Sequence, residues 1–193
     1  MSIRWKKNQN GHFCIDFRGS ARSGRDEITH LQATGINVGA HAQELLRHPD
    51  YDEHHRLVSN QTYSAVLVPG WGVPVIQRSE EEIAAHRARV GPHGAVHTKT
   101  RGAKDIQDFA RLLGYGPCLA GMVPRIREVV SDEDMEAMGF WYIMALHQPI
   151  PDADGQPRFL HSIWHHSART VGTCIDSPYI LLGERGAILF SLP

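Results

Sequence analysis

Apolar and polar residues alternate near both ends of the chain, a pattern typical of strands that bury one face. Near the N-terminus the alternation covers residues 3–7 and 13–17, on both sides of a short polar turn. A two-residue turn would place the two apolar sets on opposite faces of the hairpin. A three-residue loop with Gly11 in the left-handed conformation instead pairs Trp5 with Ile15 and buries both sets. We therefore predict a hairpin with the longer loop.

Apolar residues in the middle of the chain recur every three or four positions, the spacing of a helix with one buried face. Residues 79–82 and 131–134 have the Ser-x-x-acid pattern of a capping box, and Gly139 is a typical helix stop. A β-branched, apolar run predicts a strand over residues 61–68. The predicted helices cover residues 40–48, 79–91, 104–113, 123–130 and 131–139, and a further short helix lies within an irregular loop over residues 19–35.

The segment over residues 140–168 has two possible structures, with different consequences for its histidines. The aromatic and β-branched run after Gly139 favours a strand, a loop over 149–157 and a returning strand. In the returning strand His161 and His165 are about 13 Å apart and cannot share a metal ion. In a helix the same two residues would lie about 6 Å apart on one face. We predict the strand.

The predicted hairpin brings two histidines together. Its Asp-Ala-Asp-Gly loop suits a type I turn followed by a left-handed glycine, and this register sets His147 opposite His161 at about 5 Å between Cβ atoms. Both then lie with His165 on an otherwise apolar face. Burial of a polar group there costs free energy unless the group is hydrogen-bonded or has a functional role. The candidate catalytic residues are therefore His147, His161 and His165.

The last residues, 178–193, are apolar around a Glu-Arg-Gly turn and predict a third hairpin. Together these elements predict an α+β fold in a single domain over residues 1–193. Its sheet is mainly antiparallel and is built from N- and C-terminal hairpins. Helices from the middle of the chain are expected to pack on one face of that sheet.

Composition narrows the functional classes only slightly. The 193 residues include 20 Lys and Arg against 21 Asp and Glu, so net charge indicates no particular partner. The three cysteines are far apart and form no Cys-x-x-Cys motif, which argues against a disulfide framework or a cysteine-rich zinc site. No apolar run approaches the roughly 20 residues of a membrane span. We expect a cytoplasmic protein that does not bind membranes.

One segment, residues 86–104, combines five Lys or Arg with three His and has no acidic residue. Glycine-bearing loops and arginine side chains together bind phosphate well, although a solvated basic face would have the same composition. The segment lacks the spacing of a P-loop or a dinucleotide fingerprint. Its candidate substrate-binding residues are Arg87, Arg89, Lys99 and Arg101.

These features predict a histidine-dependent, hydrolase-type enzyme that acts on a phosphorylated or other anionic substrate. In one route His147 and His161 serve as general acid and base while the basic segment holds the anion. In the other route a divalent metal such as zinc, iron or manganese activates water. The candidate metal ligands are His147, His161, His93 and His97.

The alternative is a non-catalytic interaction or assembly protein, such as a viral structural or defence-related component. Edge strands at the two ends of the chain would then pair with other chains and form an oligomer. An anionic small molecule or a nucleic acid remains a candidate partner in either case. Substitution of any histidine would affect only stability in this second class of protein.

Overall fold

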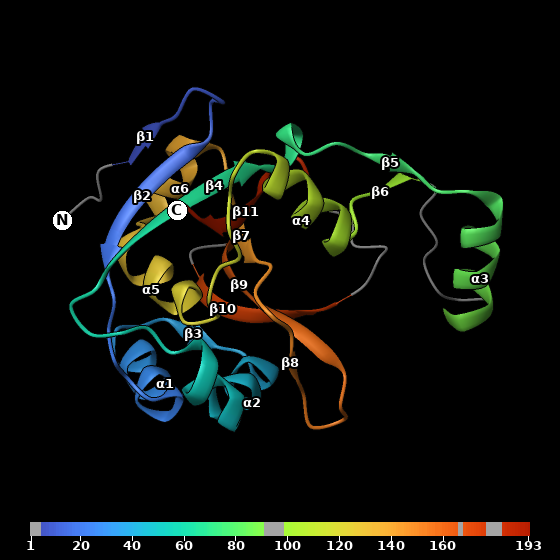
Figure 1. Ribbon diagram of the computed structural model, residues 1–193. Coiled ribbons are helices and arrows are strands. Elements are labelled where there is room, and N and C mark those ends of the chain that lie inside the picture. The colour runs from blue at the N-terminus through green and yellow to red at the C-terminus, as the bar shows by residue number, and fades with distance from the viewer. Residues whose placement is uncertain (1–4, 91–98, 166–167, 177–182) are drawn as a thin grey trace.

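A computed structural model describes residues 5–90, 99–165, 168–176 and 183–193. Within these residues the main sheet has nine strands in the order β1-β2-β4-β11-β7-β9-β10-β3, with β8 beside β9 (Figure 1). Neighbouring strands are antiparallel except β11 with β7 and β10 with β3, which are parallel. The strands are β1 (Trp5–Lys7), β2 (Phe13–Arg18), β3 (Asn37–Val38), β4 (Thr62–Pro69), β7 (Tyr142–Ala145), β8 (Ile150–Pro151), β9 (Pro157–His165), β10 (Ala168–Ile175) and β11 (Gly186–Ser191).

Helices lie on both faces of this sheet. One face is covered by α1 (Gly24–Ala33), α2 (Ala40–Arg47), α5 (Met122–Val129) and α6 (Asp132–Met138), and the other by α4 (Ala103–Leu112). The predicted α+β class is confirmed, but the helices do not all pack on one face as expected. The central strands require cover on both sides, since β4 places Leu67 in the first core and Val66 in the second.

The N-terminal hairpin forms as predicted. Trp5 pairs with Ile15 in the ladder between β1 and β2, and Gly11 has a φ of 76°. At the other end of the chain, β11 lies between β4 and β7, which occupy both of its edges. The residues predicted to form its hairpin partner, 178–182, lie outside the described residues.

Strand β9 confirms that the histidine-rich segment is extended. The register around the loop at 152–156 also agrees with the prediction, because Pro151 pairs with Pro157 and Gly155 is left-handed. The pairing then changes by three residues, so that His161 is opposite Met144 rather than His147. The predicted pairing of His147 with His161 is therefore wrong.

The change of register has a local cause in the residues between β7 and β8. Residues 146–149 bulge out of the ladder, and the backbone N–H of Leu160 donates to Nε2 of His147 at 2.9 Å. A side-chain acceptor thus takes the place of a backbone carbonyl. Because the shift is by an odd number of residues, the opposite set of β7 side chains faces His161.

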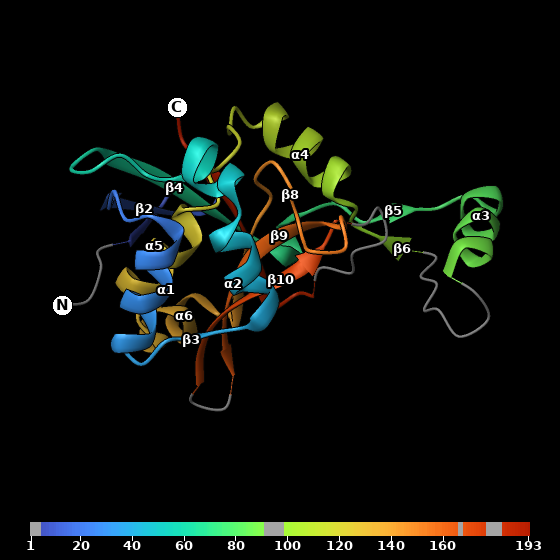
Figure 2. The same ribbon diagram turned by 90° about the horizontal axis from the view of Figure 1, so that it is seen from below.

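A smaller unit stands apart from the sheet. It consists of α3 (Glu80–Val90) and a two-stranded ribbon formed by β5 (Ile76–Gln77) and β6 (Lys99–Thr100), and we call it the arm. Both views show α3 away from the other helices (Figures 1 and 2). Among the α3 side chains whose burial is described, only Ile83 is partly covered. Among the described residues, no helix is both long and apolar enough to cross a bilayer.

Both predicted capping boxes form, and they allow a stability test. The hydroxyl of Ser131 accepts from the Asp134 N–H and caps the buried helix α6, so Ser131→Ala is expected to lower the free energy of unfolding by about 1 kcal/mol. The hydroxyl of Ser79 caps the exposed helix α3 through the Glu82 N–H, so Ser79→Ala is expected to change it by less than about 0.5 kcal/mol. Urea unfolding measures both values, and equal losses in the two variants would contradict the packing described.

Candidate functional site

His147 is fully buried and both of its ring nitrogens are hydrogen-bonded. Because Nε2 accepts from the Leu160 N–H, the proton lies on Nδ1, which donates to the Gln148 carbonyl at 2.5 Å. The pKa of His147 is lowered to about 3, chiefly by burial. The hydrogen bond to the Gln148 carbonyl opposes this shift, and the nearby His55 ring adds to it. Its geometry is that of a neutral histidine that holds the backbone together.

The ring that lies beside His147 is His55, at 5.2 Å between ring centroids. His55 ends a π-helical turn, Tyr51–His55, and its Nδ1 accepts from the Ala120 N–H at 3.3 Å. Burial lowers its pKa, and Asp50, whose Oδ2 is 3.7 Å from His55 Nε2, opposes that shift. This contact was not anticipated, because the two histidines are 92 positions apart and only the fold brings them together.

His161 has quite different surroundings. It lines an open cavity of about 370 Å³ with Trp141, Tyr142, Met144, Ile163, Cys174 and Gly183. No hydrogen bond to its ring is found among the described residues, and its nitrogens are not among the buried atoms that lack a partner. Burial lowers the pKa of His161 to about 4, so the ring is neutral at pH 7. An uncharged imidazole with free nitrogens therefore faces an apolar cavity.

Two glycines explain why the cavity is open. Gly172 lies opposite His161 on β10, and a Cβ there would be 2.4 Å from Nε2 of His161. Gly186 lies opposite Tyr142 on β11, and a Cβ there would be 2.0 Å from Cζ of Tyr142. His161 and Tyr142 come from the adjacent strands β9 and β7, so the two rings lean apart over β10 and β11. The missing side chains of the glycines create the space between them.

Tyr142 adds a polar group to the same cavity. Its hydroxyl accepts from the Gly183 N–H at 2.8 Å, which leaves the hydroxyl proton to be donated elsewhere. Burial raises the pKa of Tyr142, while the Gly183 N–H and the positive charge of Arg101 oppose that shift. Arg101, whose Nε donates to the Val73 carbonyl at 2.8 Å, therefore places a positive charge near the cavity.

Cys174 has a weakly acidic thiol in this arrangement. Burial raises the pKa of its thiol to about 12, and the charge of Asp176 raises it further. The thiol is therefore protonated at neutral pH, whereas nucleophilic attack requires the thiolate. Its Sγ lies 3.6 Å from Sδ of Met144 at the wall of the cavity.

The remaining predicted residues are dispersed or outside the described part of the chain. Arg87 on α3 and Lys99 on β6 are exposed on the arm. The side chains of Arg89 and His165 are not described, and His93 and His97 lie outside the described residues. Within the described ranges, no three His, Cys, Asp or Glu side chains are grouped to hold a metal ion. Of the predicted anion-binding residues whose side chains are described, Arg101 is the one whose charge acts on Tyr142 in the cavity.

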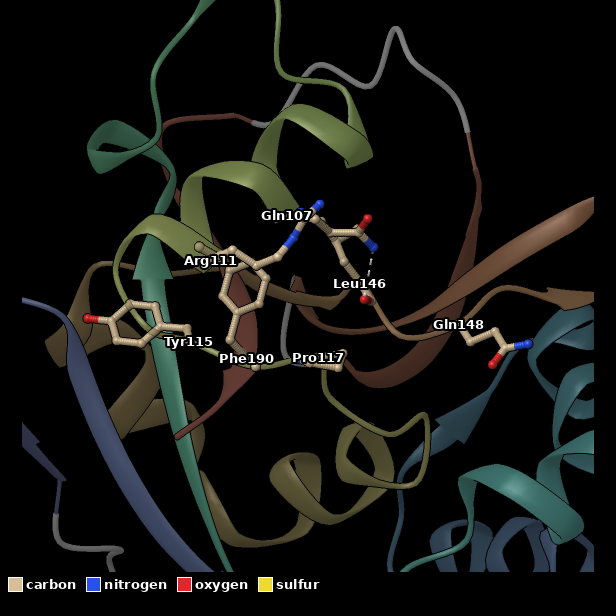
Figure 3. Close-up of a pocket in the computed structure, with 9 residues that line it drawn as sticks. Gln107, Arg111, Tyr115, Pro117, Leu146, Gln148 and Phe190 are labelled. Carbon is tan, nitrogen blue, oxygen red and sulfur yellow. Dashed lines mark hydrogen bonds between the residues drawn. The ribbon is translucent and has the colours of Figure 1, made fainter. Parts of the chain in front are cut away.

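A second cavity of about 310 Å³ lies against α4 (Figure 3). Its lining is mostly apolar, and the Gln107 amide at its edge donates to the Leu146 carbonyl at 3.4 Å. The Tyr115 hydroxyl points away from the other labelled side chains in Figure 3, and it bonds instead with Asn8, at 2.8 Å, and with His12, at 2.9 Å. Among the described residues, this cavity therefore has no reactive side-chain group directed into it.

A charged cluster between α1 and α5 is also accounted for by its internal contacts. Glu128 accepts from Arg22 at 2.7 Å and from Arg125, and its Oε1 lies 2.7 Å from Nε2 of His30. Glu27 is buried beside Arg22, and burial raises the pKa of its carboxyl to about 7. Arg22 contacts both carboxylates, while the charge of Glu128 repels that of Glu27 and adds to the rise in the pKa of Glu27.

Comparison of the chain with models of protein families, with curated proteins and with solved structures found no match. The functional argument therefore rests on the His161 cavity.

The neutral state of His147 predicts a pH dependence of stability. Its pKa is about 3 in the folded chain against 6.5 for an ordinary histidine. Between these values the unfolded chain binds a proton that the folded chain does not, so the free energy of unfolding falls as pH decreases, by at most about 1.4 kcal/mol per pH unit. His147→Leu is expected to be less stable at pH 7, because Leu160 N–H loses its acceptor, and to depend less on pH between 6.5 and 4.5.

Urea unfolding at pH 7, 6 and 5 measures this difference. Glu27 acts in the opposite sense, because its raised pKa makes the folded chain bind the extra proton, but it is present in both proteins and cancels in the comparison. His41→Ala, a change at an exposed residue beside Glu44, is the matched control and should keep the wild-type slope. An unchanged slope in His147→Leu would show that His147 is not the proton-linked group.

Proposed function

We propose that the protein is a histidine-dependent enzyme whose substrate binds in the cavity between Tyr142 and His161. The observation that carries the proposal is the free, neutral imidazole of His161 in an apolar cavity of about 370 Å³. Histidines with perturbed pKa values in clefts are typical of active sites. Of the two histidines predicted to act as a pair, the proposal retains His161 as the catalytic residue. It gives His147 a structural role in the sheet.

The chemistry supported by these groups is general base catalysis with a hydrogen-bond donor opposite. His161 is neutral and can accept a proton from water or from a substrate hydroxyl. Tyr142 can donate its hydroxyl proton to an oxygen that gains negative charge, because its own acceptor position is taken by the Gly183 N–H. Hydrolysis of an ester-like or phosphoester bond uses both groups, with water as the nucleophile.

The lining of the cavity indicates the class of substrate. Trp141, Ile163 and Met144 favour a flat or apolar portion of the molecule. Arg101 supplies a positive charge near Tyr142, which favours an anionic or polarised group at that end. We propose a small molecule with one apolar and one anionic part, rather than a polymer.

His161→Gln is expected to reduce kcat/KM about 100-fold or more in a screen of chromogenic esters and phosphoesters, because general base catalysis typically contributes this much. Glutamine keeps a polar side chain of similar size but cannot take up a proton at neutral pH. His54→Ala, at an exposed histidine on the π-helical turn, should keep full activity. Activity of the wild type that survives His161→Gln would contradict the role of His161.

Gly172→Ala tests the same site without removing the imidazole. The added methyl group collides with the His161 ring, so the ring must move toward the cavity, and we expect KM to rise and kcat to fall. Gly39→Ala is the matched control, because a Cβ there meets only the Val171 carbonyl oxygen at an ordinary 3.7 Å. Equal activity of the two variants would exclude the cavity as the substrate site.

An assembly role is the second candidate, and the arm favours it. Trp71, Val75 and Ile76 are exposed by 55%, 46% and 37% on the segment that leads into the arm. Neighbouring apolar side chains in water are typical of protein contacts. The edge strands do not favour sheet pairing, because β1 and β3 are only 3 and 2 residues long. We propose that any self-association uses this apolar segment.

The double substitution Val75→Asp and Ile76→Asp is expected to convert an oligomer to a monomer while leaving the main sheet folded. Light scattering over a range of protein concentrations measures the mass. Val58→Asp changes an equally exposed apolar residue of the loop before β4 and is the control. A wild-type protein that is monomeric at high concentration would exclude self-association.

A further inference from the structure

We propose that the wall of the cavity is a binding site for a soft monovalent metal ion, Cu(I), with Met144, Cys174 and His161 as its ligands. The three residues come from the adjacent strands β7, β10 and β9, and all three line the same cavity. Thioether, thiol and imidazole groups are the ligands that Cu(I) prefers in proteins. The site goes beyond the proposed function and does not depend on it, because metal binding is measured directly.

The two sulfur atoms already have the separation that a shared metal ion requires. Sγ of Cys174 lies 3.6 Å from Sδ of Met144. Two sulfurs that each bind one ion at about 2.3 Å, with a tetrahedral angle between them, are about 3.8 Å apart. Met144 and Cys174 are 30 positions apart and lie on strands separated by β9, so the sheet and not the local sequence sets this distance.

His161 is placed to supply the third ligand. It pairs with Met144 across β7 and β9, and it lies on the same face of β9 as Phe159, which pairs with Cys174. Its Nε2 lies over Gly172, two positions from Cys174 on β10. The ring therefore leans toward the strand that carries the thiol, and no hydrogen bond in the described residues competes for it.

Charge balance selects a monovalent ion over a divalent one. The residues that line the cavity include no carboxylate. When the metal binds, the Cys174 thiol loses its proton to solvent and the thiolate carries one negative charge, while the other two ligands are neutral. A Cu(I) complex is then neutral overall, whereas a zinc complex would carry one net positive charge, and the carboxylate that acts on Cys174, that of Asp176, is not part of the cavity lining. The cavity thus fits the predicted divalent cofactors less well.

The metal and the proposed catalytic role exclude one another at His161. A ring nitrogen that is bound to Cu(I) cannot accept a proton, so loading with one equivalent of Cu(I) is expected to inhibit any activity of the cavity. Activity must accordingly be assayed on protein treated with a chelator. Failure of one proposal leaves the other standing, because binding and turnover are separate measurements.

The experiment is anaerobic titration of the full chain with Cu(I), in competition with a chromogenic Cu(I) chelator. We expect one equivalent to bind. Met144→Leu, Cys174→Ser and His161→Gln should each weaken binding about tenfold or more, since even groups that only support metal ligands are worth about 10–100-fold in affinity. Cys14→Ser is the matched control, because Cys14 is buried in the same core and lines no part of the cavity. Zinc is the control ion and should not bind there.

Circular dichroism checks that each variant is folded, and Cys174→Ala replaces Cys174→Ser if the serine variant does not fold. Loss of binding in the three ligand variants, with full binding in Cys14→Ser, supports the site. Absence of stoichiometric binding by the wild type overturns it. Binding that is unchanged in Met144→Leu and His161→Gln overturns it as well, because the ion would then be held by a cysteine alone.

Discussion

The hydrogen bond from the Leu160 N–H to Nε2 of His147 fixes the part of the sheet on which the candidate site depends. Because of this bond, residues 146–149 can leave the strand pairing while the buried Leu160 N–H still has a hydrogen-bond acceptor. The pairing of β7 with β9 is thereby displaced by three residues from that of β8 with β9. An odd displacement exchanges the two faces, and Tyr142 therefore shares a face with His161. The buried His147 thus determines the surroundings of the histidine that faces the cavity.

The cavity depends on two glycines, which have no side chains at positions on β10 and β11. Gly172 and Gly186 leave room for the rings of His161 and Tyr142 to lean apart, and a methyl group at either position would close the space. The same apolar surroundings keep His161 neutral and Cys174 protonated. The proposed acid–base chemistry and the proposed soft-metal binding both depend on this property, because each requires an imidazole without a charge and without a fixed partner.

Local patterns in the sequence were good predictors of local structure. The hairpin with Trp5 opposite Ile15, the capping boxes and the left-handed Gly139 all depend on residues within about 15 positions of one another, and all of them form. The register around the left-handed Gly155 was also predicted correctly, although β8 lies inside the predicted loop over 149–157. The predicted register was wrong at the point where the His147 side chain, instead of a backbone carbonyl, accepts from the Leu160 N–H. The alternation of apolar and polar residues gives no sign of such a replacement. The cover of the second sheet face by α4 was missed for a similar reason, because it depends on which strands become central.

The sequence by itself determined the α+β class, the extended state of the segment 157–165 and the presence of an imidazole at position 161. Only the tertiary structure decided that His147 lies against His55 and that His161 faces Met144 and Cys174. The physical reason is the range of the interactions. Turns, caps and strand propensity act between neighbours in the chain, whereas register and strand order are set by the burial of both sheet faces together.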